Sequence, residues 1–181
     1  MARNIEIKAR IESIEAMAAR VAALAEHGPI EIEQDDTFFA CPRGRLKLRA
    51  LSPQEGQLIF YHRPDQAGPK ESSFVIAPTS EPDAMREALT NAYGQTGRVR
   101  KHRTLYLIGR TRVHLDRVEG LGEFLELEVV LAEGEPSEPG VAQAHKLLTA
   151  LAIAPEQLIE GAYVDLLTAR SRGPGRDGAA C

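Results

Sequence analysis

The chain opens on a stretch, residues 3–11, in which polar and apolar residues alternate without a break. Because successive side chains of a β-strand point to opposite faces, Glu6 and Lys8 share one face while Ile5 and Ile7 share the other. The pattern predicts a strand with one charged and one apolar face. A strand of this kind ordinarily turns its charged face to solvent, and the alternative is that the face lines the inside of a closed sheet.

Seven further stretches have the pattern of strands, and turn signals such as Pro42-Arg43-Gly44 and Gly109 separate neighbouring ones. Short connections between consecutive strands favour antiparallel pairing. A total of about eight strands is enough for an antiparallel sheet to close on itself. The seven stretches are residues 30–40, 45–51, 57–63, 71–79, 98–108, 111–118 and 124–132.

Apolar residues at helical spacing interrupt the strands. The first helix is expected to begin after Ser13 and to end at Gly28-Pro29, and its apolar stripe, which includes Leu24, needs a partner such as the isoleucines of the first strand. The other expected helical segments are one from Ser80 to Gly94 with the stripe Met85, Ala88, Leu89 and Ala92, a third helix after a loop over 133–140, a short turn over 155–159, and a last helix over 162–170.

Composition and length are those of one globular domain. The net charge of −4 gives no overall basic field for binding nucleic acid, and no apolar run reaches the length of a signal peptide or a membrane span. A cytoplasmic protein with no nucleic-acid or membrane partner is therefore expected. We predict one α+β domain over residues 1–170 and a disordered tail over residues 171–181.

Charge is segregated by strand. On a solvated face, like charges are more often mixed with Ser, Thr and Gln, although solvation explains any single strand about as well. Repetition over several strands favours a closed sheet in which basic side chains surround a polyanion and carboxylates hold Mg²⁺ or Mn²⁺. The sets that share a strand face are Arg45, Lys47 and Arg49; Lys101 and Arg103; His114 and Asp116; and Glu126 and Glu128.

The other candidate residues give weaker evidence for a role in catalysis or binding. His114 is a possible ligand or general base, but a lone histidine on a strand is more often structural. The tyrosines, among them Tyr61 and Tyr163, show no arrangement for base stacking and are expected in the core or at a rim. No glycine-rich phosphate loop between a strand and a helix is present, so side chains would have to hold a phosphate.

Six motifs follow one another along the chain. They are Asn4-x-Glu6-x-Lys8, Gln-Asp-Asp-Thr-Phe-Phe at 34–39, Arg-Leu-Lys-Leu-Arg at 45–49, Leu-Ile-Phe-Tyr-His-Arg-Pro at 58–64, Lys-His-Arg at 101–103, and a long motif over 114–128 that begins His-Leu-Asp-Arg-Val. In this order and spacing the chain resembles the CYTH family, also called triphosphate tunnel metalloenzymes, and in particular its class IV adenylyl cyclase-like branch. The resemblance runs from Asn4 to about Leu167.

The resemblance implies an eight-stranded antiparallel β-barrel whose charged lumen binds a triphosphate together with Mg²⁺ or Mn²⁺. It makes Lys8, Arg103 and Asp116 the candidate catalytic residues. The metal ligands that it implies are Glu6, Glu126, Glu128 and Asp116. The substrate-binding residues that it implies are Lys8, Arg45, Lys47, Arg49, Arg63, Lys101 and Arg103, with one or two of them expected to point outward.

Asn4 stands where the family motif usually has its first Glu. An amide can coordinate a metal through its carbonyl oxygen but brings no charge, which leaves open whether one or two metals bind.

Two reactions use the same charged residues: cyclisation of ATP to cyclic AMP and pyrophosphate, or hydrolysis of tripolyphosphate, thiamine triphosphate or a nucleoside triphosphate. The motifs favour the cyclase, the triphosphatase is the alternative, and a sensor that binds a nucleotide or polyphosphate without turnover is a third hypothesis. Either a monomer or a homodimer is expected.

Overall fold

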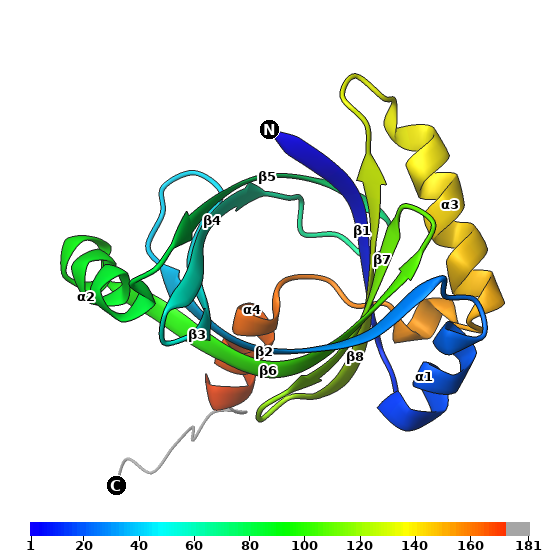
Figure 1. Cartoon of the computed structure of the whole chain (residues 1–181), viewed down its shortest axis with the longest axis horizontal. Helices are drawn as coiled ribbons and strands as arrows, with labels where there is room; N and C mark the ends of the chain where they lie inside the picture. The colour runs from blue at the N-terminus through cyan, green and yellow to red at the C-terminus, as the bar shows by residue number, and fades with distance from the viewer. Residues whose placement is uncertain (173–181) are drawn as a thin grey trace, which may run out of the picture.

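A computed structural model describes residues 1–172, which form eight strands closed into an antiparallel barrel (Figure 1). The order around the barrel is β1, β5, β4, β3, β2, β6, β7 and β8, so each strand pairs on both sides. The predicted α+β class and the eight-stranded antiparallel barrel are confirmed. The strands are β1 Ala2–Arg10, β2 His27–Phe39, β3 Arg45–Ser52, β4 Glu55–His62, β5 Lys70–Thr79, β6 Gln95–Ile108, β7 Thr111–Val118 and β8 Gly122–Leu131.

Consecutive strands pair through their short connections, as predicted, in the runs from β2 to β5 and from β6 to β8. The first strand closes the barrel, because β1 pairs with β5 on one side and with β8 on the other. Residues far apart in sequence are thereby brought into register, with Glu6 opposite Glu128 and Lys8 opposite Glu126.

The main hydrophobic core lies outside the barrel, between its wall and two helices, α1 (Ile14–Ala22) and α3 (Ser137–Ala150) (Figure 1). Ile5, Ile7 and Ala9 of β1 are completely buried beneath this layer. Since side chains alternate along a strand, the charged residues between them face the lumen. The charged face of the first strand therefore lines the inside of the barrel.

The predicted end of the first helix is wrong. Helix α1 ends at Ala22 rather than at Gly28-Pro29, and Leu24 beyond it is 41% exposed. His27 already pairs with Leu107 of β6, and the amide of Glu26 donates a hydrogen bond to the same residue's carbonyl at 2.9 Å. The segment that the apolar stripe had assigned to the helix therefore pairs with β6 as part of a strand.

The loop predicted over 133–140 is also wrong at its C-terminal end, because α3 begins at Ser137. Gly140 lies inside this helix at a point of close packing. A Cβ atom there would lie 2.7 Å from Cγ1 of Ile5 and 2.8 Å from Cδ2 of Leu131. The glycine that signalled a loop in the sequence instead lets the helix approach the sheet.

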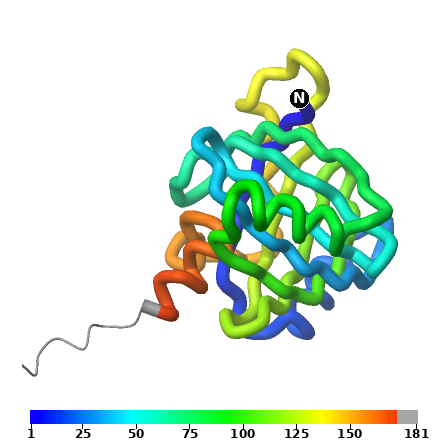
Figure 2. The backbone as a smooth tube through the Cα atoms, turned by 90° about the vertical axis from the view of Figure 1, so that its left-hand side faces the viewer, coloured from blue at the N-terminus to red at the C-terminus, as the bar shows by residue number. Residues whose placement is uncertain are grey.

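Helix α2 (Pro82–Tyr93) lies on the opposite side of the barrel from α1 and α3, and it crosses the front of the view in Figure 2. It ends at Gly94 as predicted, but its expected apolar stripe is only partly covered. Met85 and Leu89 are half-buried, whereas Ala88 and Ala92 are exposed. This helix therefore contributes less to the core than its periodicity suggested.

Helix α4 (Tyr163–Arg172) covers one end of the barrel instead of its outer wall. Its first turn packs on Phe38, Val99 and Phe124, which close that end with apolar side chains. Gly97 permits this approach, since a Cβ atom there would clash with Cγ2 of Val164.

The expected short turn before α4 is present as a 3₁₀ helix over Pro155–Gln157. The last helix extends two residues beyond its predicted end, through Ser171 and Arg172. These two residues were assigned to the predicted disordered tail, and the rest of that tail, 173–181, lies outside the described residues.

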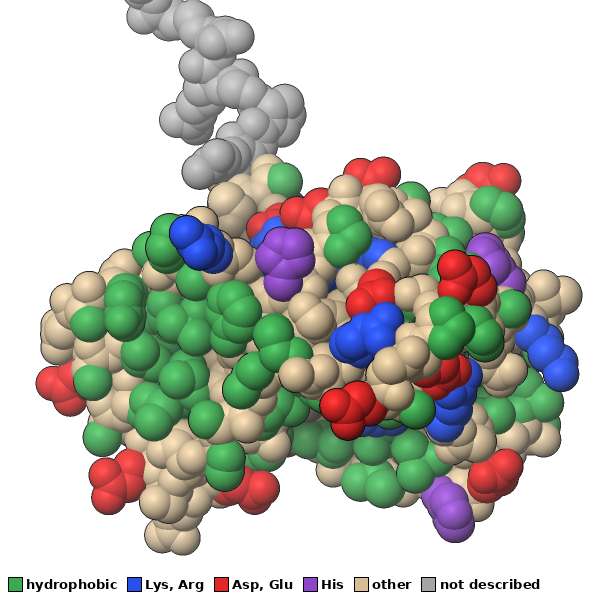
Figure 3. Space-filling model, turned by 90° about the horizontal axis from the view of Figure 1, so that it is seen from above, with side chains coloured by type: hydrophobic (Ala, Val, Ile, Leu, Met, Phe, Trp, Pro, Cys, Tyr) green, Lys and Arg blue, Asp and Glu red, His purple; other side chains and the backbone are tan. Residues whose placement is uncertain are grey.

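The outer surface carries charges of both signs, together with an area of hydrophobic side chains on the left of the view from above (Figure 3). One of the exposed hydrophobic residues of the protein is Val75 of β5, which is 49% exposed. Among residues 1–172, no helix is both long enough and apolar enough to cross a membrane.

Candidate active site in the barrel lumen

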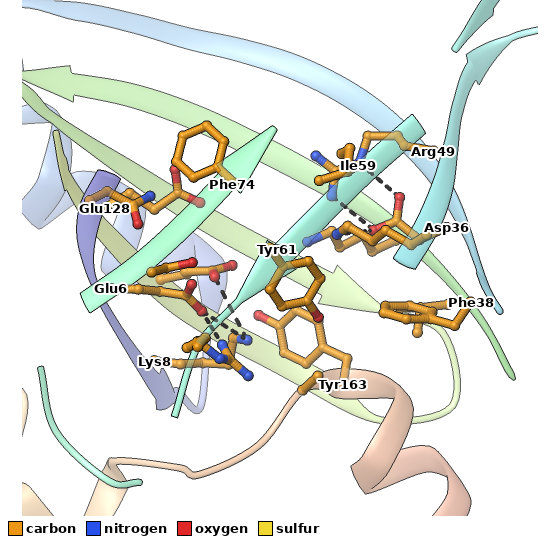
Figure 4. Close-up of a pocket in the computed structure, with 18 of the residues that line it drawn as sticks. Glu6, Lys8, Asp36, Phe38, Arg49, Ile59, Tyr61, Phe74, Glu128 and Tyr163 are labelled. Atoms are coloured by element: carbon orange, nitrogen blue, oxygen red, sulfur yellow. Dashed lines mark hydrogen bonds and ion pairs between the residues drawn. The ribbon is translucent and has the colours of Figure 1, made fainter. Parts of the chain in front are cut away.

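The inward-facing side chains surround a cavity of about 130 Å³ inside the barrel (Figure 4). Basic side chains outnumber carboxylates around it, which favours an anionic occupant. The basic residues are Lys8, Lys47, Arg49, Arg63, Lys101 and Arg103, and the carboxylates are Glu6, Asp36, Glu126 and Glu128. The apolar and aromatic lining includes Phe38, Ile59, Tyr61, Phe74 and Tyr163.

Asp36 of β2 holds two cations of β3. Its carboxylate accepts hydrogen bonds from Nζ of Lys47 and from Nε and Nη2 of Arg49, each at 2.8 Å. Burial alone would raise the pKa of Asp36, but Arg49 and Lys47 beside it hold that pKa far below its usual value. The aspartate therefore stays ionised and fixes both side chains against the cavity wall.

Asp116 of β7 plays the same part for β6. Its carboxylate, fully buried, accepts from Nε of Arg103 at 2.6 Å and from Nζ of Lys101 at 2.7 Å. Against the effect of burial, these two cations hold the pKa of Asp116 well below its usual value. Burial and the neighbouring Arg103 lower the pKa of Lys101 to about 8. Two Asp–Lys–Arg clusters thus stand on the neighbouring strands β3, β2, β6 and β7.

The carboxylates gather on the adjoining strands β1 and β8. Nζ of Lys8 lies 3.9 Å from Oε1 of Glu6 and 3.7 Å from Oε1 of Glu126, and Arg63 donates a hydrogen bond to Glu6. Burial and the charge of Glu126 raise the pKa of Glu6 to about 6, against the opposing effect of Arg63 and Lys8. Two carboxylates in close proximity repel each other, and a bound cation would relieve that repulsion.

Glu128 adjoins this pair and is held from the side by Arg112, whose Nε donates to Oε2 at 2.9 Å. His114 lies behind it, with one ligand atom each from His114, Glu126 and Glu128 within 4.8 Å of one another. Burial and the charge of Arg103 lower the pKa of His114 to about 4, so that the imidazole is neutral at neutral pH.

The lumen collects most of the residues that the sequence proposed. Arg45 is the exception, because it lies at the rim, where its guanidinium donates to Asp65 and Asp165 at 3.0 Å. Asp116 does reach the interior, but both its oxygens are occupied by hydrogen bonds from basic side chains and from the hydroxyl of Tyr163.

Asn4 lines the cavity and is 4% exposed. Its Oδ1 atom is buried and has no hydrogen-bond partner within residues 1–172. Buried polar atoms normally find a partner, so an unsatisfied acceptor facing the lumen is consistent with a ligand that supplies one.

Two site residues had no assigned role in the sequence. The signal for Asp36 was present, because it alternates with Gln34 and Phe38 and so shares their strand face. Tyr163 is buried in the apolar cluster at the barrel end, in agreement with its expected place in the core or at a rim, and its ring also lies 4.1 Å from Nζ of Lys8 and 5.0 Å from Nζ of Lys101. Periodicity gives no sign of that contact, since it depends on where α4 crosses the barrel end.

Comparison with known proteins agrees with this geometry. The CYTH domain model matches residues 2–163, which is most of the chain. The chain belongs to the CYTH domain family. Its CYTH relatives include the adenylate cyclase CyaB of Aeromonas hydrophila, which is 26% identical over 169 residues, covering 88% of this chain and 86% of that protein.

Solved structures share the CYTH fold. The PH1012 protein of Pyrococcus horikoshii superimposes with a TM-score of 0.80 and 23% identity over 90% of this chain and 98% of its own. A Hippeastrum protein, HpAC1, named as an adenylyl cyclase and described as having a dominant triphosphatase activity, has a TM-score of 0.64 and 15% identity over 97% of this chain and 98% of its own. At these identities the likeness establishes the fold.

Proposed function

We propose that this protein is a metal-dependent enzyme that acts on a triphosphate, with cyclisation of ATP to cyclic AMP and pyrophosphate as its reaction. The observation that carries the proposal is the division of the lumen into a basic wall, formed by Lys47 and Arg49 of β3 and by Lys101 and Arg103 of β6, and a carboxylate wall on β1 and β8. A polyphosphate chain fits the first wall and a divalent cation the second. The similarity to an adenylate cyclase over 88% of the chain supports the choice of reaction.

The carboxylate wall fits a hard divalent cation. Glu6 and Glu126 lie close enough for one to raise the pKa of the other. Oδ1 of Asn4, which has no partner among the described residues, lies on the same inner face of β1 as Glu6. Oxygen donors of this kind suit Mg²⁺ or Mn²⁺, and Glu6, Glu126 and Glu128 would hold the ion. A bound ion would neutralise charge on the phosphoryl oxygens.

The basic wall acts on the phosphates. Arg49 and Arg103 each present a planar guanidinium whose orientation is fixed by an aspartate, so little side-chain entropy is lost when a phosphate binds. In cyclisation the 3′-hydroxyl attacks the α-phosphate and negative charge grows on the departing pyrophosphate. Fixed cations around the leaving group stabilise that charge.

Asp116 serves, in this proposal, to position cations and not to bind metal. Its two oxygens accept hydrogen bonds from Arg103, Lys101 and Tyr163, and it is fully buried. Lys8, between Glu6 and Glu126, is placed to contact a phosphate that bridges the two walls.

Product analysis tests the reaction. The purified protein would be incubated with Mn²⁺ or Mg²⁺ and either ATP or tripolyphosphate, and the products separated by ion-exchange chromatography. Cyclic AMP and pyrophosphate in equal amounts are expected from ATP. Orthophosphate without cyclic AMP would show that the reaction is that of a triphosphatase and not of a cyclase. Triphosphatase activity is the activity described for the Hippeastrum protein. Binding of both compounds without any product would overturn the proposal of an enzyme and would support the hypothesis of a sensor.

A further inference from the structure

His114 stands beside the carboxylate wall without a role of its own. It lies on β7 directly opposite Glu126 of β8, on the inner face of the barrel. Its side chain is 4% exposed. Its Nδ1 atom has no hydrogen-bond partner within residues 1–172, and the nearest acidic oxygen, Oε1 of Glu128, is 3.8 Å away. That separation is too long for a hydrogen bond.

A buried histidine with a structural role normally donates or accepts through its ring nitrogens. Nδ1 of His114 lacks such a contact within the described residues, although Glu126 and Glu128 lie near it. The imidazole ring therefore lies near two carboxylates, and its Nδ1 atom forms a hydrogen bond with neither of them. An occupant between the three side chains would account for the arrangement.

The spacing suits a metal ion. The ligand atoms of His114, Glu126 and Glu128 all lie within 4.8 Å of one another. Donors about 2.1 Å from a shared metal ion lie about 3 to 4.2 Å apart, so small side-chain movements would bring these three into one coordination sphere. Nδ1 of His114, which has no partner among residues 1–172, is the independent sign that the cluster is more than a group of neighbouring acids.

We propose that His114 is a direct ligand, together with Glu126 and Glu128, of the divalent metal in the lumen. The inference rests on the proposed metal-dependent function and specifies the ion that the site prefers. An imidazole donor favours transition metals over Mg²⁺, which binds oxygen almost exclusively. The neutral Asn4 on β1 adds no charge that would restore affinity for a hard ion. The site is thus selective for Mn²⁺ or Co²⁺ over Mg²⁺.

Pulsed electron paramagnetic resonance of the full-length protein with Mn²⁺ alone tests the assignment directly. A histidine nitrogen bound to Mn²⁺ gives ¹⁴N modulation of the electron spin echo, and this modulation is expected in the unmodified protein. His114→Phe should abolish it and weaken Mn²⁺ binding at least tenfold by calorimetry, while Mg²⁺ binding changes less than threefold. His102→Phe is the matched control, because His102 also lies near a carboxylate, 3.2 Å from Glu31, but is partly exposed.

The outcomes separate the two proposals. Bound Mn²⁺ without ¹⁴N modulation, or with modulation that persists in His114→Phe, would overturn the histidine ligand and leave the carboxylate site and the proposed function intact. Absence of any bound Mn²⁺ would overturn the metal-dependent function and the ligand assignment with it. Bound Mn²⁺ without ¹⁴N modulation in the unmodified protein would overturn the histidine ligand even if the variant does not fold.

Discussion

Tyr163 of α4 donates a hydrogen bond from its hydroxyl to Oδ2 of Asp116, at 3.0 Å, within the closed end of the barrel. The two residues are 47 positions apart in sequence. Asp116 also fixes Lys101 and Arg103, so the terminal helix is joined through one carboxylate to two of the cations that line the lumen. The helix that closes the barrel end and the basic wall are therefore parts of one network.

Tyr163→Phe tests this connection. The ring contact with Phe124, at 4.9 Å between centroids, would be kept, and only the hydroxyl would be lost. Because the bond is buried, its loss should lower the free energy of unfolding by about 1 kcal/mol in urea denaturation. Tyr93→Phe is the control, because Tyr93 is 55% exposed, and it should leave the free energy of unfolding unchanged. Equal stability of both variants would mean that the hydroxyl contributes nothing.

Much of the fold follows from local patterns. Alternation in the strands and turn signals between them predict eight antiparallel strands, because each strand has one apolar face that must be covered. Errors arise where tertiary contacts override local signals. Gly140 marks a loop by composition but allows close packing inside α3, and the segment after Ala22 pairs with β6 instead of continuing a helix.

The site is predictable to the extent that it depends on which face of a strand a residue occupies. Lys101 and Arg103 could be placed together from spacing alone, since they lie two residues apart on one strand. What could not be read is the register of β2 against β3 that sets Asp36 opposite Arg49, or the path of α4 that brings Tyr163 over Lys8. The first contact depends on the hairpin register and the second on how the terminal helix crosses the barrel end, and neither is contained in a local period.

Arg49→Ala should weaken binding of tripolyphosphate at least tenfold, measured by calorimetry at fixed salt. Arg49 lines the cavity and would lose a charge-assisted contact with phosphate. Arg45→Ala is the matched control on the same strand, because Arg45 pairs with Asp65 and Asp165 at the rim. The control should bind with less than threefold change. Equal losses in both variants would count against the distinction between lumen and rim.

Acid should destabilise the protein partly through Asp36. Its pKa lies below the usual value in the folded state, so the unfolded chain takes up the proton first. The free energy of unfolding contributed by Asp36 is therefore complete above about pH 4, the pKa of an unperturbed Asp, and is lost as the pH falls toward the lower folded value. Asp36→Asn should flatten the decline in stability between pH 5 and pH 2, followed by urea unfolding at each pH. An equally steep decline in the variant would show that other carboxylates account for it.

Glu126→Gln and Glu128→Gln should each reduce metal-dependent turnover more than tenfold. Each substitution keeps the shape of the side chain and removes one negative charge from the carboxylate wall. Saturating Mn²⁺ should rescue part of the loss if the defect is one of metal binding. Glu133→Gln, at an exposed position just after β8, is the control. Rates close to those of the unmodified protein in both lumen variants would remove these residues from the metal site.

Asn4→Glu changes the one position of the first-strand motif at which a carboxylate is missing. In the absence of metal, a further buried carboxylate near Glu6 should lower the free energy of unfolding by about 1–3 kcal/mol, because burial disfavours its charge. Mn²⁺ should remove most of that penalty and bind more tightly than in the unmodified protein, since the new carboxylate faces the same lumen as Glu6. Both quantities come from urea unfolding with and without metal, with Asn91→Glu on the exposed side of α2 as the control. If Mn²⁺ stabilised the variant no more than the unmodified protein, position 4 would lie outside the reach of the metal.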